Sequence, residues 1–267
     1  MTKTVAIGGL GAIGLKLARA LDADIEGLRL IAVAARDQAK AEAKLSEFRT
    51  PPALVPLHRL AEADIVVEAA PAEVFEPIAI TAIEAGRILV PASAGALLPR
   101  MHLVERARET GARIVVPTGA LLGLDAMRAA AEGHVDSVTI ESRKPPRGLA
   151  GAPYLVRHGI DVSGITRPTR VFAGNAFDAA AGFPANVNVA AALALAGIGP
   201  TRTQCEIWAD PGIDRNIHTI RVEAEAARFT MTIENVPSAE NPRTGQITAL
   251  SMLACLRGLV ATLKVGT

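Results

Sequence analysis

The fold is decided by the stretch Val5-Ala6-Ile7-Gly8-Gly9-Leu10-Gly11-Ala12-Ile13-Gly14. A short apolar run leads into a glycine-rich turn, and a helix-forming segment follows. In the G-x-G-x-x-G pattern, Gly9 permits a tight turn, Gly11 lets a pyrophosphate approach, and Gly14 lets helix and strand pack closely. The free N–H groups at the helix start favour phosphate binding. The alternative is a tight turn without a ligand. We predict cofactor contacts from Gly9, Leu10, Gly11, Ala12, Ile13 and Gly14.

Cofactor choice is expected at the end of the second predicted strand, residues 28–35. An acidic side chain there would bind the adenosine ribose 2′-OH, whereas an arginine accommodates a 2′-phosphate. Residues Ala34 and Ala35 are followed by Arg36 and Asp37. Arg36 favours NADP, and Asp37 leaves NAD possible. Alternatively, Arg36 is only a solvated loop charge.

Strands and helices alternate through the first half of the chain, which predicts a parallel, doubly wound sheet. The carboxyl ends of such strands face the cofactor crevice. Ala70 and Pro71 follow one of these strands and Ser93 follows another, so we expect all three near the cofactor. The predicted strands cover residues 63–70, 87–91 and 113–116, and the helices cover 38–48, 74–85 and 99–110.

The pattern changes after Pro117. Residues 135–143 alternate between apolar and polar, as in a strand that is covered on one side only. Similar segments follow at 171–174, 202–209, 217–225 and 228–235, with a cover helix at 186–196. We predict an α/β protein with a Rossmann-type domain over residues 1–120. A smaller α+β domain with a mostly antiparallel, open-faced sheet follows over 121–243, and a helix at 244–263 packs back on the first domain.

Composition excludes several classes of function. Half of the 267 residues are hydrophobic and the net charge is +1, so no general attraction to nucleic acid or acidic membranes is expected. Cys205 and Cys255 fit neither a metal spacing nor a disulfide framework. The longest apolar run, residues 189–198, is too short to span a bilayer. We expect a soluble, cytoplasmic protein without a signal peptide or a metal site.

His218 is the best candidate for acid–base chemistry. It shares a strand face with Ile220 and Val222, so it should point toward the covered side of the sheet. A half-buried histidine near a cleft suits proton transfer, because its ordinary pKa lies near neutral pH. The alternative is a core histidine that hydrogen-bonds a neighbour.

Other polar residues mark possible contacts for cofactor and substrate. Asn186 is placed to cap the cover helix, and the amide of Asn188 suits a nicotinamide carboxamide. Ala120 lies in the glycine-rich segment at the domain junction. Lys144 and Arg243 are possible partners for carboxylates, although either could simply be solvated.

Taken together, these stretches resemble the L-aspartate dehydrogenase family. The resemblance rests on the following motifs, in this order: Gly9–Gly14, Thr118-Gly119-Ala120 with Gly123–Ala126, Arg143–Pro146, Phe183–Ala190, Ala209-Asp210-Pro211 with Asn216-Ile217-His218, and Asn241–Gly245. It implies a Rossmann domain joined to a smaller α/β domain, in a homodimer. It also implies NAD(P)-dependent oxidation of L-aspartate to iminoaspartate, reversible as amination of oxaloacetate with ammonia, and in some members a supply for NAD biosynthesis.

The resemblance assigns the catalytic histidine to His218 and nicotinamide-side contacts to Ala120 and Asn188. Because no acidic residue stands at Ala34 or Ala35, the chain resembles members that tolerate NADP, and we expect NADP, NAD or both as cofactor. Two alternatives remain open. One is another imine or carbonyl reductase, similar to dihydrodipicolinate reductase or homoserine dehydrogenase, because a fold does not determine a substrate. The other is a non-catalytic NAD(P)-sensing protein.

Overall fold

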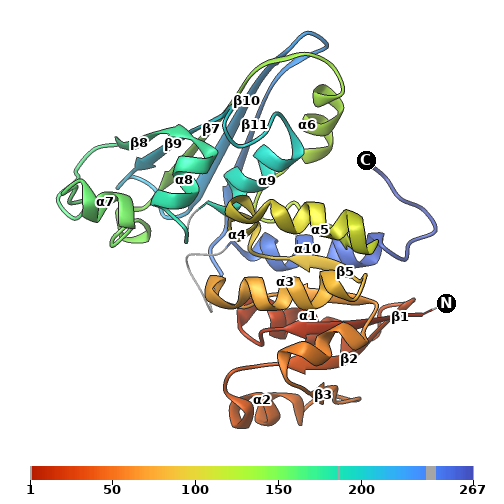
Figure 1. Cartoon of the computed structure of the whole chain (residues 1–267). Helices are drawn as coiled ribbons and strands as arrows, with labels where there is room; N and C mark the ends of the chain where they lie inside the picture. The colour runs from red at the N-terminus through yellow and green to blue at the C-terminus, as the bar shows by residue number, and fades with distance from the viewer. Residues whose placement is uncertain (1, 186, 239–244, 267) are drawn as a thin grey trace. The chain divides into compact units, whose positions relative to one another are not determined.

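The chain forms two compact units (Figure 1). The computed structural model describes residues 2–185, 187–238 and 245–266. Unit 1 comprises Met1–Ser93, Arg100–Pro117 and Thr248–Lys264, and unit 2 comprises Ala94–Pro99, Thr118–Ile247 and Val265–Thr267. The short segment Ala94–Pro99 therefore interrupts the first unit, a feature absent from the continuous range 1–120 proposed above.

Unit 1 is built on a six-stranded sheet in the order β3-β2-β1-β4-β5-β6. Every strand pair in it is parallel, as expected when helices connect the strands. Its elements are β1 (Lys3–Gly8), α1 (Ala12–Asp22), β2 (Leu28–Ala34), α2 (Gln38–Leu45), β3 (Ala53–Leu54), β4 (Ile65–Glu68), α3 (Phe75–Glu84), β5 (Ile88–Pro91), α5 (His102–Thr110), β6 (Arg113–Ile114) and most of α10 (Gln246–Gly258).

Alternate residues of β1 pack against different helices. Val5 and Ile7 belong to an apolar cluster with Leu17 of α1 and Met252 of α10. On the other side, a Cβ placed on Gly8 would meet Ile78 of α3. Helices therefore cover both faces of the sheet, which explains why its central strands are continuous apolar runs.

Unit 2 contains a five-stranded sheet in the order β11-β10-β7-β9-β8. Its pairs are antiparallel except for the parallel pair of β7 and β9. Its elements are α4 (Ala94–Leu97), α6 (Leu124–Ala131), β7 (Val135–Lys144), α7 (Pro153–Arg157), β8 (Thr169–Asn175), α8 (Ala176–Gly182), α9 (Asn188–Ala196), β9 (Thr203–Ala209), β10 (Asn216–Ala224) and β11 (Arg228–Asn235).

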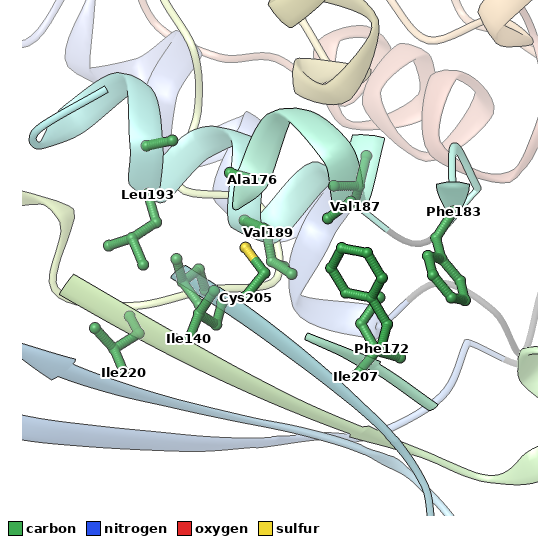
Figure 2. Close-up of a cluster of buried hydrophobic side chains, with 14 of the residues drawn as sticks. Ile140, Phe172, Ala176, Phe183, Val187, Val189, Leu193, Cys205, Ile207 and Ile220 are labelled. Atoms are coloured by element: carbon green, nitrogen blue, oxygen red, sulfur yellow. The ribbon is translucent and has the colours of Figure 1, made fainter. Parts of the chain in front are cut away.

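One face of this sheet carries the core of unit 2. Ile140, Cys205 and Ile220 project from three adjacent strands toward Leu193 of α9 (Figure 2). The other face is polar: Arg143 lies over the ring of Trp208, with 5.3 Å from the guanidinium carbon to the ring centroid. The α/β fold class with a second, mostly antiparallel sheet is thus confirmed.

The structure differs from the sequence prediction at the ends of some helices and strands and in two short helices. The helix predicted at 38–48 ends at Leu45, and the strand predicted at 63–70 is only Ile65–Glu68. The cover helix begins at Asn188 rather than at residue 186. The short helices α7 and α8 were not predicted, because neither has the length over which an apolar period can be recognised.

The glycine-rich turn has the three properties that its pattern requires. Gly9 has a φ of +105°, and a Cβ on it would collide with the backbone of Ala69. A Cβ on Gly14 would overlap the carbonyl group of Gly9, because α1 packs directly on the turn. At Gly11, by contrast, an added Cβ would meet no heavy atom within 4 Å, so this position lies open.

We expect Gly14→Ala and Gly11→Ala to affect stability very differently. The Gly14 variant forces a methyl group against a backbone carbonyl and should lose about 2–3 kcal/mol of unfolding free energy. At Gly11 the backbone is extended, with φ −77° and ψ −164°, so alanine fits and should change stability by no more than about 0.5 kcal/mol. Urea unfolding of both variants measures this difference, and equal losses would contradict it.

Candidate active site

The start of helix α1 in unit 1 forms an open cradle for an anion. Gly11 is the N-cap residue, no side chain caps the helix, and both Gly11 and Ala12 are exposed. The turn is held in place by hydrogen bonds from Gly9 N to Ala34 O (2.8 Å) and from the Lys44 amine to Leu10 O (3.2 Å). Since α1 has no acidic residue in its first turn, its free N–H groups and dipole favour a phosphate.

The two charged residues after β2 have different surroundings. The carboxylate of Asp37 accepts a hydrogen bond from Lys40 N at 3.0 Å and thereby caps α2. Arg36 is exposed and forms no ion pair within the described part of the chain. The acidic group is therefore engaged in helix capping, whereas the guanidinium remains available for a ligand.

Glu68 is a buried acid at the carboxyl end of β4 that sequence reasoning missed. It has no exposed surface, and its carboxylate accepts hydrogen bonds from Ala70 N (3.0 Å), Ser93 N (3.0 Å) and Ser93 Oγ (3.1 Å). Burial raises its pKa, although these hydrogen bonds oppose the shift. Glu68 thus brings together Ala70 and Ser93, two of the predicted cofactor contacts. The charged residue at the end of an apolar strand was the available signal.

In unit 2, the covered face of the sheet changes from apolar to polar at one end. Along β7 the buried residues run from Val138 and Ile140 to Ser142 and Lys144. His218 of β10 lies directly opposite Ser142 in the register. All three polar side chains are buried, with exposed fractions of 6% for Ser142, 4% for Lys144 and 2% for His218. His218 therefore points to the covered side, as the alternation of β10 predicts.

The imidazole of His218 is held by one side-chain hydrogen bond. Its Nδ1 lies 2.9 Å from Ser142 Oγ. Burial, assisted by the charge of Lys144, lowers the pKa of His218 to about 3. The ring is consequently neutral through the physiological pH range.

Lys144 is a buried cation with no counter-ion in the part of the chain that the structure describes. Burial lowers its pKa to about 8, and no acidic side chain lies within ion-pair distance of it among the described residues. The nearby carboxylate of Asp210 is instead engaged by Arg143 at 3.4 Å and by Gly212 N at 2.9 Å. An unpaired buried charge is costly, so this position favours an anionic ligand.

Hydrogen bonds also hold the predicted nicotinamide-side residues in unit 2. Asn235 donates from Nδ2 to the carbonyl of Ala120 at 3.0 Å. The side-chain oxygen of Asn188 accepts from Gly95 N at 3.0 Å, and the Asn188 NH₂ group has no hydrogen-bond partner among the described residues. A Cβ on Gly95 would meet Val187 and this oxygen, so glycine is needed for the close approach of α4 to α9.

Not every predicted contact can be placed. Asn186 and Arg243 lie outside the described residues. Pro71 is exposed directly after Ala70. No group of three or more histidine, cysteine or acidic side chains converges as a metal site in the described ranges. Nor does any helix among those residues have the length and apolar character needed to cross a membrane.

We expect Lys144→Met to stabilise the protein at neutral pH. The folded-state pKa of about 8 lies below the ordinary value of 10.5, so the cost of burying the charge is fully present below pH 8. It disappears as the pH rises toward 10.5. Removing the charge should add about 3 kcal/mol of unfolding free energy at pH 7, and this gain should shrink above pH 8.

Urea unfolding between pH 6 and 10 measures this effect, with the exposed Lys40→Met as the matched control. A Lys144 variant that is less stable than the wild type at pH 7 would show that the lysine has a compensating partner.

Two family models match the chain. The model "Homoserine dehydrogenase, NAD binding domain" matches residues 9–117, and "Aspartate dehydrogenase, C-terminal" matches residues 125–259. The first match includes the open glycine turn. The second includes the polar end of the sheet with Ser142, Lys144 and His218.

Curated relatives match over nearly the whole chain. An L-aspartate dehydrogenase of Bradyrhizobium diazoefficiens is 54% identical over 98% of this chain and 94% of its own length. L-aspartate dehydrogenase 3 of Bordetella bronchiseptica is 51% identical over 98% of this chain and 97% of its own length.

Solved structures agree with these relatives. The crystal structure of aspartate dehydrogenase from Thermotoga maritima superposes with a TM-score of 0.76 at 26% identity and covers all of both chains. A homoserine dehydrogenase of Thiobacillus denitrificans, with a TM-score of 0.63 and 15% identity over 97% of this chain and 73% of that one, shares the fold. On this evidence, the chain belongs to the L-aspartate dehydrogenase family.

Proposed function

We propose that this chain catalyses the NAD(P)-dependent oxidation of L-aspartate to iminoaspartate and, in reverse, the reductive amination of oxaloacetate with ammonia. The observation that carries this proposal is the buried Lys144, which has no ion-pair partner among residues 2–185, 187–238 and 245–266, beside a neutral His218 in a chain 54% identical to an L-aspartate dehydrogenase. A carboxylate of a dicarboxylate substrate would supply a negatively charged partner for Lys144. The neutral imidazole of His218 can donate or accept a hydrogen bond without adding a second positive charge beside Lys144.

The glycine turn fits the pyrophosphate of a dinucleotide. At Gly11 a side chain would occupy open space rather than protein, which is the property that a closely approaching phosphate requires. We assign the pyrophosphate to the backbone of the turn from Gly9 to Gly14 and the adenosine 2′-phosphate to Arg36. The remaining cofactor contacts in this proposal are Ala70, Pro71, Ser93, Ala120 and Asn188.

The bound nicotinamide would take a hydride from C2 of aspartate or return it to the imine carbon. The protein positions the reacting groups. His218 contacts the amino nitrogen or the water that adds to the imine, and Lys144 holds a substrate carboxylate. Asn186 and Arg243 are proposed as further substrate contacts.

The family resemblance also supports a homodimer in the cytoplasm that uses ammonia as its nitrogen donor. It supports a role in supplying iminoaspartate for NAD biosynthesis. Light scattering of the purified protein tests the dimer, and omission of ammonium from the reductive assay tests the nitrogen donor.

The function is tested by the absorbance of NADPH or NADH in the presence of oxaloacetate and ammonium. We expect ammonium-dependent oxidation, and we expect His218→Asn to lower its rate by about 100-fold. The exposed His102→Asn is the matched control and should keep the wild-type rate. Cofactor binding without ammonium-dependent turnover would instead favour another reductase activity or a nucleotide sensor.

Arg36→Ala should change cofactor preference. Loss of the guanidinium removes a charge-assisted contact to the 2′-phosphate, so KM for NADPH should rise about tenfold while KM for NADH stays nearly constant. Arg29→Ala removes an exposed arginine from the start of β2, the strand that Arg36 follows, and should alter neither value. Equal changes in KM for NADPH and NADH would show that Arg36 does not contact the 2′-phosphate.

A further inference from the structure

Ser142 and His218 form a buried pair across two neighbouring strands. They are direct register partners on β7 and β10, with Ser142 Oγ 2.9 Å from His218 Nδ1. Because both residues sit on regular strands, the backbone sets this distance. The imidazole is therefore anchored at Nδ1, which leaves Nε2 as the nitrogen that can face a ligand.

The direction of this hydrogen bond follows from the groups around Ser142. On the covered face, its neighbours are Ile140 and Lys144 on its own strand and Ile207 on β9. Isoleucine offers no side-chain acceptor, and a charged lysine amine only donates. Among the described side chains, the acceptor available to the Ser142 hydroxyl is Nδ1 of His218, so Ser142 donates this hydrogen bond.

The opposite arrangement is less favourable. If Nδ1 carried the ring proton and donated it to Ser142, the buried hydroxyl proton would have no side-chain acceptor in the described part of the chain. A buried donor left in this way loses its hydrogen bond to water without replacement. The resulting preference for the tautomer with its proton on Nε2 is about fivefold to a hundredfold, which corresponds to about 1–3 kcal/mol at 1.4 kcal/mol per factor of ten.

The charge state of the ring makes this tautomer important. Burial disfavours the charged form of His218, and the charge of Lys144, two residues after Ser142 on the same face of β7, adds to this effect. His218 therefore remains neutral, and its chemistry depends on which nitrogen holds the single ring proton. A neutral ring with a proton on Nε2 donates a hydrogen bond there, whereas the other tautomer accepts one.

We propose that Ser142 is a positioning residue that holds His218 as the neutral Nε2–H tautomer, so that His218 serves the reaction as a hydrogen-bond donor. The identity of the substrate atom that accepts this hydrogen bond rests on the proposed function. A donor suits an oxygen atom: the carbonyl oxygen of oxaloacetate, or the hydroxyl that adds to or leaves the imine carbon. Ser142 itself contacts no reacting atom in this arrangement.

The tautomer can be observed directly by nitrogen NMR. Protonated and unprotonated ring nitrogens of histidine have well-separated ¹⁵N shifts, and the full-length ¹⁵N-labelled protein can be measured at pH 7 with and without NADH. Loss of signals in His218→Asn assigns this ring among the five histidines. We expect a protonated Nε2 and an unprotonated Nδ1 in the wild type.

Variants at Ser142 test its part in this preference. Ser142→Ala should shift the two ring signals toward a mixture of tautomers and lower kcat for oxaloacetate amination about tenfold or more, with KM for NADH nearly unchanged. Ser142→Thr keeps the hydroxyl and should restore both the spectrum and most of the rate. Ser137→Ala makes the same change at an exposed position of β7 and should behave as the wild type.

The outcomes separate this inference from the proposed function. A wild-type spectrum with the proton on Nδ1, or an unchanged tautomer in Ser142→Ala, overturns the role of Ser142 whatever the activity. If Ser142→Ala does not fold, the wild-type and Ser142→Thr spectra still decide. If the spectra are as predicted but the protein has no aspartate dehydrogenase activity, the role of Ser142 toward His218 stands and the proposed substrate is wrong.

Discussion

The close packing of helix α1 on the glycine turn is the constraint on which unit 1 depends. Gly9 N bonds to the end of β2 at Ala34 O, and Gly8 O accepts from Ala69 N at the end of β4. The turn therefore joins the ends of three adjacent strands. Side chains at Gly9 or Gly14 would break this arrangement, because the space that a Cβ needs is filled by backbone. The same packing exposes the start of the helix, so stability and the proposed phosphate binding share one cause.

Unit 2 depends on a different balance. Its sheet buries apolar side chains along most of one face and then buries three polar ones at the end. Lys144 has no counter-ion among the described residues, so its buried charge opposes folding at neutral pH. Burial of His218 opposes folding only below the ordinary histidine pKa of 6.5, where the unfolded ring would take up a proton. Binding sites commonly carry such costs, because a ligand of opposite charge recovers them. The lowered pKa values of Lys144 and His218 reflect this arrangement.

Buried polar residues hold the proposed contacts in position in both units. Glu68 links the loops after β4 and β5 through Ala70 and Ser93. Asn235 holds the Ala120 carbonyl, and Ser142 holds His218. Each of these supporting groups is at least nine-tenths buried. Rigid partners of this kind keep reacting groups within the narrow geometry that catalysis requires.

The sequence by itself determined the parallel sheet of unit 1, the change of pattern after Pro117, the glycine turn and the covered orientation of His218. Each of these follows from local chemistry: apolar periodicity, glycine spacing and the alternation of a strand. Extending that alternation from Val138 and Ile140 by two further steps would also have placed Ser142 and Lys144 on the covered face.

Only the tertiary structure decided which side chains meet. The pairing of Ser142 with His218 joins positions 76 residues apart, and it depends on strand register, which local sequence does not encode. The links of Glu68 to Ser93 and of Asn188 to Gly95 likewise arise when distant loops come together. Burial, and with it the shifted pKa values of Lys144 and His218, is a property of the surroundings that the whole fold creates.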